Sequence, residues 1–187
     1  MNIINVGYDS TNYYILEAKD VKLLIDCGWP GTRPRFMAQL KRKGISIGEI
    51  KYLLVTHFHP DHAGLAQELK NLGMKLVLLE TQRDGISSLT EFFTGKSYPY
   101  VEIKQNDNIV LNFEDTRESL SSLGIQGEIL RTPGHSDDSV TLILDEGFAF
   151  TGDLHPSIMD IDDLKTRESW DKINQHKISR VFPGHGQ

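Results

Sequence analysis

The chain contains one cysteine and no long run of apolar residues. Cys27 cannot form a disulfide within the chain, which suits a reducing compartment. No segment approaches the roughly 20 apolar residues that cross a membrane. The opening residues MNIINVGYDS lack the basic start and the apolar stretch of an export signal. We therefore expect a cytoplasmic protein with no membrane partner.

The chain also lacks an excess of basic residues, with 20 Lys and Arg against 26 Asp and Glu and a net charge of -6. Because proteins that bind nucleic acids usually carry a basic surface, we expect no nucleic-acid partner. The basic residues between positions 33 and 43 favour the solvated face of a helix. The 187 residues fit one domain, residues 1–187, that is large enough to fold without disulfides.

Hydrophobic patterning alternates between strand and helix along the chain. Short runs rich in β-branched and aromatic residues predict strands at 2–7, 12–18, 21–27, 51–56, 75–80, 127–132, 139–145, 148–152 and 180–182. Helical spacing predicts helices at 33–44, 62–73 and 164–177. In the second of these, Leu65, Leu69 and Leu72 share one face. Residues 81–126 give no clear pattern. The alternation predicts an α+β fold in which two sheets lie between helices.

The stretch THFHPDHAG, residues 56–64, holds three of the seven histidines and an aspartate. Buried imidazoles and carboxylates cost free energy unless each has a partner, and a divalent cation is the partner that suits such a cluster best. His57 and His59 project to the same side if the segment is extended. Asp61 and His62 follow where a helix is expected to begin, with Asp61 as its N-cap. All four are candidate metal ligands.

Three more candidate ligands follow later, each at the end of a predicted strand and beside a glycine: His135 in TPGHS, Asp153 in TGDLH and His185 in PGHGQ. Glycine lets the backbone turn sharply, and strand ends that meet at one edge of a sandwich can assemble a site. Five histidines and two carboxylates are too many for one zinc ion, which takes three or four protein ligands. The candidates therefore fit two ions.

These motifs resemble, in their order along the chain, the metallo-β-lactamase-fold hydrolases: NYYIL, LLIDCG, THFHPDH, TPGHS, TGD and PGHG. The resemblance covers nearly the whole chain and implies a four-layer αββα sandwich with a binuclear site at one edge. It divides the candidates into two ligand sets and a bridge: His57, His59 and His135; Asp61, His62 and His185; and Asp153. It also implies that Asp26 holds a ligating imidazole in one tautomer.

The implied chemistry is hydrolysis by a hydroxide that bridges two divalent metal ions. Two cations about 3.5 Å apart can lower the pKa of this water towards ~7, so that no activated serine or cysteine is needed. Asp61 is the implied catalytic residue, which orients the hydroxide and passes on its proton. The mixed nitrogen and oxygen ligands favour zinc, with iron and manganese as alternatives.

Departures from the subgroups of this family narrow the expected substrate. The β-lactamases that name the fold lack the bridging aspartate that Asp153 provides, and the flavodiiron relatives carry glutamate where His59 stands. Glyoxalase II type thioesterases and acyl-homoserine lactonases share the bridge, although the glyoxalase enzymes add a helical domain that binds glutathione. The expected substrate is a small ester, thioester or lactone.

Other functions and roles remain open at this level. The alternatives are a mononuclear iron oxidoreductase like the persulfide dioxygenases, a phosphodiesterase on the same fold, and a binding protein that keeps the fold without catalysis. The sequence is also consistent with a homodimer.

Several individual residues keep two interpretations. His155 either contacts the site or is a turn residue before Pro156, and Trp29 either lines the pocket or is a core residue. The aromatic residues between 92 and 100 line a substrate groove or belong to the core. Ser136 and Ser139 hydrogen-bond near the site or begin a strand. We expect His176 to be exposed and Cys27 to be a small buried residue.

Overall fold

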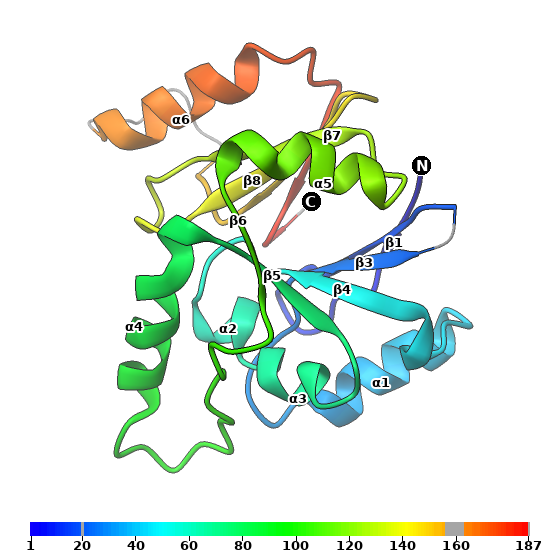
Figure 1. Cartoon of the computed structure of the whole chain (residues 1–187). Helices are drawn as coiled ribbons and strands as arrows, with labels where there is room; N and C mark the ends of the chain where they lie inside the picture. The colour runs from blue at the N-terminus through cyan, green and yellow to red at the C-terminus, as the bar shows by residue number, and fades with distance from the viewer. Residues whose placement is uncertain (20, 156–162, 187) are drawn as a thin grey trace.

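The structure is a computed structural model that describes residues 1–19, 21–155 and 163–186. Two β-sheets face each other, and helices cover both outer sides (Figure 1). The predicted fold, a four-layer αββα sandwich, is therefore confirmed. Within the described ranges, no helix combines the length and the apolar character needed to cross a lipid bilayer.

The first sheet has the strand order β1-β2-β3-β4-β5-β6. Its strands are β1 (Asn2–Asn5), β2 (Tyr14–Glu17), β3 (Lys22–Ile25), β4 (Ile50–Leu54), β5 (Lys75–Leu79) and β6 (Ile109–Leu111). The first three pair antiparallel, as the closely spaced strand patterns near the N-terminus predict, and β3 to β6 pair in parallel. Parallel strands end at the same edge of the sheet, so the segments after β3 and β4 begin side by side.

The second sheet has the order β10-β9-β8-β7. Its strands are β7 (Gly127–Arg131), β8 (Val140–Leu144), β9 (Phe148–Gly152) and β10 (Arg180–Pro183). The last strand runs parallel to β9, so that the segments after Gly152 and Pro183 leave the sheet at one edge. β7 pairs antiparallel with β8, and β8 pairs antiparallel with β9; short connections join these strands.

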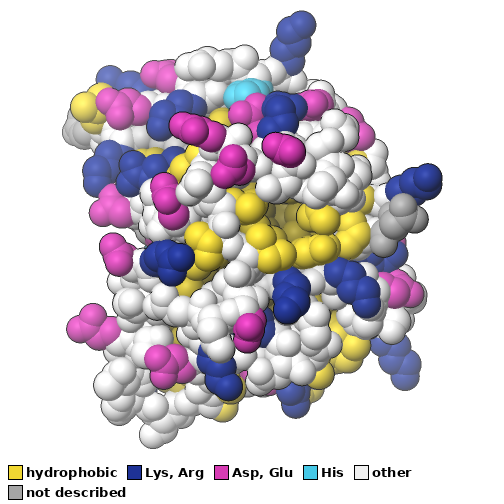
Figure 2. Space-filling view, in the orientation of Figure 1, with side chains coloured by type: hydrophobic (Ala, Val, Ile, Leu, Met, Phe, Trp, Pro, Cys, Tyr) yellow, Lys and Arg dark blue, Asp and Glu magenta, His cyan; other side chains and the backbone are white. Residues whose placement is uncertain are grey.

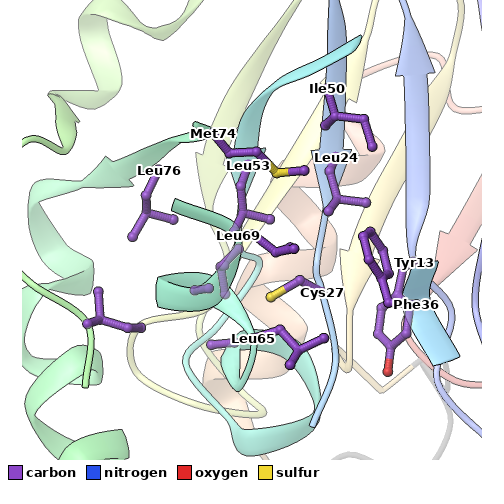
Figure 3. Packing of buried hydrophobic residues seen from close by; sticks show 14 of the residues in the cluster. Tyr13, Leu24, Cys27, Phe36, Ile50, Leu53, Leu65, Leu69, Met74 and Leu76 are labelled. Atoms are coloured by element: carbon purple, nitrogen blue, oxygen red, sulfur yellow. The ribbon is translucent and has the colours of Figure 1, made fainter. Parts of the chain in front are cut away.

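The helices are α1 (Arg33–Arg42), α2 (Pro60–Ala63), α3 (Ala66–Lys70), α4 (Arg83–Phe93), α5 (Thr116–Ser122) and α6 (Leu164–Asn174). Short 3-10 turns occupy Ile47–Glu49, Glu80–Gln82 and Phe113–Asp115. Phe36 of α1 and Leu69 of α3 pack on the outer side of the first sheet (Figure 3). Trp170 and Ile173 of α6 pack on the outer side of the second sheet.

Alternation along the strands separates these layers. In β2, Tyr14 and Leu16 belong to the core between the sheets, whereas Ile15 faces the helices. In β3, Leu24 faces the helices, whereas Leu23 and Ile25 belong to the core between the sheets. Successive side chains of a strand point to opposite faces, so strands that are apolar throughout are expected where both faces are covered.

One face of the molecule has an apolar hollow between α5 and the first sheet (Figure 2). The hollow has a volume of about 200 Å³. Leu54, Val77 and Leu120 are among its lining residues. Around it, acidic and basic side chains are interspersed on the face that Figure 2 shows.

Two expectations about helices need correction. The helix predicted at 62–73 is broken into α2 and α3, and Leu72, predicted to share one helical face with Leu65 and Leu69, is 45% exposed whereas those two are buried. α2 starts early, at Pro60, and at the break the backbone N–H of Leu65 donates to the carbonyl oxygen of Gly28 over 3.0 Å rather than to a carbonyl of the helix. Residues 81–126, which gave no clear pattern, contain α4, the short edge strand β6 and α5.

Leu69 and Leu72 provide a matched test of this correction. Leu69 is fully buried under the first sheet, so Leu69→Ala should lower the free energy of unfolding by about 2–5 kcal/mol. Leu72→Ala should change it by less than about 0.5 kcal/mol. Urea denaturation of both variants measures the difference. Equal losses of stability would contradict the broken helix and support the single amphipathic helix predicted at 62–73.

Candidate metal centre

The seven candidate ligands meet at one edge of the sandwich, each close after the end of a strand. His57 and His59 follow β4, and Asp61 and His62 lie in α2 immediately beyond. His135 follows β7, Asp153 follows β9 directly and His185 follows β10. The structure therefore brings together all the residues that the sequence put forward, although they are spread over 129 positions, from 57 to 185.

His57, His59 and His135 form the first group, which we call the first triad. Each offers a ring nitrogen, and these nitrogens lie within 4.8 Å of one another. His59 Nδ1 lies 3.0 Å from His135 Nε2. His57 is buried, whereas His59 and His135 are partly open to solvent. Three imidazoles with converging nitrogens suit a divalent cation.

Asp61, His62 and His185 form the second triad, again with ligand atoms within 4.8 Å of one another. Asp61 Oδ2 lies 3.1 Å from His185 Nε2 and 3.6 Å from His62 Nε2. His62 is fully buried and His185 is 39% exposed. Asp61 is not the predicted N-cap, because α2 begins at Pro60 and His59 occupies the capping position.

Asp153 lies between the two triads. Its Oδ2 is 3.6 Å from His135 Nε2 and 3.3 Å from His185 Nε2. The same atom is 3.8 Å from His57 Nε2, and Oδ1 is 3.2 Å from His62 Nε2. One carboxylate thus faces both histidine sets, which is the arrangement expected of a bridge.

The donor atoms fit a metal ion by a second criterion. Among the described residues, three buried polar side-chain atoms make no hydrogen bond: His57 Nε2, His62 Nε2 and Asp153 Oδ1. All three point into the same small region of the site. Buried polar atoms in folded proteins nearly always have a partner, and a cation would satisfy these three together.

The pKa values differ between the two buried histidines. Burial, together with the neighbouring imidazoles, lowers the pKa of His57 well below its usual range, so its ring is neutral. Burial opposes a charge on His62 too, but Asp26 and Asp153 outweigh it and raise the pKa of His62 to about 10. Burial alone would raise the pKa of Asp153, but His62, His185 and His135 hold it below its usual range. A cation bound beside Asp26 and Asp153 would therefore replace the proton that His62 carries.

Hydrogen bonds at the far side of each ring fix which nitrogen faces the site. His62 Nδ1 is 2.8 Å from Asp26 Oδ2, and His185 Nδ1 donates to the carbonyl oxygen of Ser10 over 2.7 Å. His57 Nδ1 is 3.2 Å from Thr56 Oγ1, which itself donates to Asp26. Nε2 of each of the three rings is therefore left to face the site.

Asp26 occupies the position that the family resemblance implied. It is 2% exposed, and its Oδ1 accepts the backbone N–H of Thr56 over 2.7 Å. Its φ of 60° lies in the left-handed region, which aspartate tolerates better than most residues. The turn after β3 thus places the carboxylate of Asp26 against the Nδ1 side of His62.

Sequence reasoning missed the residues that support the ligands from the loop between β1 and β2. Thr11 Oγ1 donates to Asp61 Oδ2 over 3.3 Å, and Asn12 Nδ2 donates to the carbonyl oxygens of Pro183 and Gly186. Ser10 contributes only its carbonyl oxygen. A backbone acceptor leaves no signal in the residue type, so only Thr11 and Asn12 could have been proposed.

Several residues with two interpretations can now be placed. His155 lines a hollow beside Asp153, and its carbonyl oxygen accepts from Trp170 Nε1; Pro156 lies outside the described residues. Trp29 packs edge-on against Phe92, Phe93 and Tyr98, with ring centroids 5.8–6.5 Å apart.

Three further expectations concern polar residues. Ser136 and Ser139 share a hydrogen bond of 2.7 Å beside His135. Cys27 is fully buried, as expected, and burial raises the pKa of its thiol. His176 is partly buried rather than exposed, with its Nδ1 3.9 Å from Glu128 Oε1.

Comparison with known proteins gives three kinds of match. Residues 6–185 match the family model described as the metallo-beta-lactamase superfamily. A protein named as a probable metallo-hydrolase of Methanocaldococcus jannaschii is 30% identical over 198 residues, covering 97% of this chain and 89% of that protein. A beta-lactamase-like protein 2 homolog of Drosophila melanogaster is also 30% identical, but the matched region covers 94% of this chain and 58% of that protein.

Solved structures agree on the fold. A metallo-beta-lactamase family protein from Thermus thermophilus superposes with a TM-score of 0.74 at 20% identity, covering all of this chain and 73% of that one. The metallo-beta-lactamase MIM-1 from Novosphingobium pentaromativorans gives a TM-score of 0.73 at 20% identity, covering 98% and 73%. At 20% identity, the likeness to these structures shows the fold alone.

Gly184 allows Asp153 and His62 to lie close together in the site. A Cβ at this position would lie 2.5 Å from Asp153 Oδ1 and 2.6 Å from His62 Cε1. Gly184→Ala should therefore displace a donor atom and weaken zinc binding by about tenfold or more. Gly48→Ala, where the nearest atom is 3.9 Å away, is the control. Calorimetric titration with Zn²⁺ measures both, and equal affinities would contradict the proposed packing.

Proposed function

The chain belongs to the metallo-beta-lactamase superfamily and is a metal-dependent hydrolase of it, and from that premise we propose that it uses two divalent metal ions to hydrolyse a small ester, thioester or lactone. Zinc is the proposed metal, with iron or manganese as substitutes. The observation that carries the proposal is the position of Asp153. Its two oxygens lie 3.2–3.8 Å from the Nε2 atoms of histidines in both triads.

In this proposal each triad holds one ion and Asp153 contacts both. A pair of bound cations would supply a nucleophile derived from water at neutral pH and withdraw electrons from the substrate carbonyl. The protein holds the histidines ready for this role through Asp26, Thr56 and Ser10, which keep the Nε2 lone pairs of three rings directed inward.

Asp61 is the proposed catalytic residue. Thr11 holds its Oδ2 beside His185, and the side chain is 31% exposed. It therefore lies at the solvent side of the site, where a substrate and a water molecule can enter. A carboxylate in this position can orient the attacking water and accept its proton.

The hollow beside Asp153 supports a neutral acyl substrate. Its volume is about 380 Å³, and Leu154, Trp170 and Val181 supply much of its apolar wall. None of the described residues that line it is Lys or Arg. A phosphodiester carries a negative charge that basic side chains usually recognise, so this lining favours the acyl substrate over the phosphodiesterase alternative.

The proposal is tested by loading the protein with metal and assaying it. We expect two equivalents of zinc per chain and turnover of at least one of the acyl thioesters, esters and lactones in a panel that also contains phosphodiesters. A single equivalent of iron with thiol-dependent uptake of oxygen would instead establish the persulfide dioxygenase alternative. Two bound ions without turnover of any substrate would favour a binding protein.

Asp61→Asn tests the catalytic carboxylate. The amide cannot accept a proton, so kcat should fall by about 10²–10⁴-fold in steady-state assays of the zinc enzyme. Asp145→Asn changes an exposed carboxylate that pairs with Arg117 and should leave kcat unchanged. Metal content is measured on both variants, because only a loss of kcat at full occupancy assigns the proton to Asp61.

Val181→Phe tests the substrate hollow. The larger ring should fill space beside Asp153 and raise KM by about tenfold for a bulky acyl substrate, with kcat little changed. Val110→Phe makes the same change on the edge strand β6, where the side chain is 39% exposed, and should alter neither constant. Unchanged KM values in both variants would remove the hollow from substrate binding.

A further inference from the structure

A second carboxylate lies beside the candidate ligands. Asp138 Oδ2 accepts the backbone N–H of Phe58 over 2.7 Å, and Phe58 stands between His57 and His59. Asp138 Oδ1 accepts the hydroxyl of Ser136 over 2.7 Å, and Ser136 directly follows His135. One side chain therefore connects the two loops that carry all three members of the first triad.

The position of Asp138 is itself fixed. Gln82 is fully buried and donates through Nε2 to the carbonyl oxygens of Val55 and Asp138, over 3.0 and 3.2 Å. A Cβ at Gly85, in the first turn of α4, would lie 2.3 Å from Asp138 Oδ2, so the carboxylate packs directly against that helix. The hydrogen-bonded network thus joins the end of β4, the start of α4 and the loop after β7.

Asp138 and Asp26 support different parts of the centre. Asp26 binds the ring of His62, which belongs to the second triad, and reaches the first triad only at His57, through Thr56. Asp138 binds the backbone beside His59 and the side chain beside His135. His59 and His135 are also the more exposed histidines of the first triad.

We propose that Asp138 is a positioning residue that fixes the separation of the His57–His59 loop from the His135 loop and thereby sets the affinity of the first triad for its metal ion. This inference rests on the proposed two-ion centre. Removing the carboxylate would free both loops at once, while the contacts of the second triad with Asp26, Thr11 and Ser10 would remain.

The test is a titration of the metal-free protein with Co²⁺, followed by absorption spectroscopy. The unchanged protein should bind two equivalents. Asp138→Ala should bind one equivalent with unchanged affinity and the other about 10–100-fold more weakly. With one equivalent of Co²⁺, its spectrum should resemble that of His135→Ala, which lacks a ligand of the first triad, and differ from that of His185→Ala.

Two variants control for a purely structural role. Asp138→Asn keeps an oxygen that can accept from Phe58 and should restore most of the lost affinity. Asp137→Ala removes the neighbouring carboxylate, which is 81% exposed and paired with Lys165, and should bind two equivalents normally. Urea denaturation of each metal-free variant shows whether affinity merely follows stability.

The outcomes separate the two proposals. If the unchanged protein binds fewer than two equivalents, the two-ion centre fails, and this inference fails with it. If the unchanged protein binds two while Asp138→Ala keeps both affinities, or weakens both equally, the positioning role is overturned and the centre stands. Should Asp138→Ala not fold, Ser136→Ala decides in the same titration, because it removes only one half of the connection. Weaker binding of one equivalent supports the proposal, and unchanged binding overturns it.

Discussion

The site depends on the buried carboxylate of Asp26. It accepts hydrogen bonds from the backbone and hydroxyl of Thr56, and it holds the Nδ1 side of His62. These contacts tie the end of β3 to the end of β4 and to α2, three segments that come together only in the folded chain. Without this acceptor, three polar groups at the centre of the first sheet's edge would lose their partner. The orientation of His62, and through Thr56 that of His57, follows from one side chain.

Much of the fold was predictable because its signals are local. The apolar character of 14–16 and 23–25 predicts strands, and the structure shows why each is apolar throughout, since one face meets the second sheet and the other meets helices. The seven candidate ligands were also recognisable, because imidazoles and carboxylates beside glycines at strand ends form an unusual pattern. Their convergence, however, requires the order of the strands, which spacing alone does not provide. It entered through the family resemblance.

What could not be predicted depends on distant partners. The carbonyl oxygen of Ser10 that orients His185 is common to every residue type, and Asp138 reaches Phe58 across 80 positions of the chain. Leu72 does not share the buried face of Leu69, because α3 ends at Lys70, and helical spacing alone does not reveal where a helix ends. The weak pattern of 81–126 has a similar cause, since β6 has three residues and gains its stability by pairing with β5.

The two triads lie at one sandwich edge but rest on different supports. The second triad contains the fully buried His62, whose ring is fixed by a buried carboxylate. The first triad includes the exposed His59 and the partly exposed His135, and it is fixed through backbone and loop contacts. Asp153 faces histidines of both triads, so its carboxylate is common to the two halves. His59, His135, Asp61 and His185 form the exposed side of the site, while the interior of the sandwich keeps His57 and His62 in place. The site can therefore be open to solvent although Asp26 and Thr56, which hold its two buried histidines, are themselves buried.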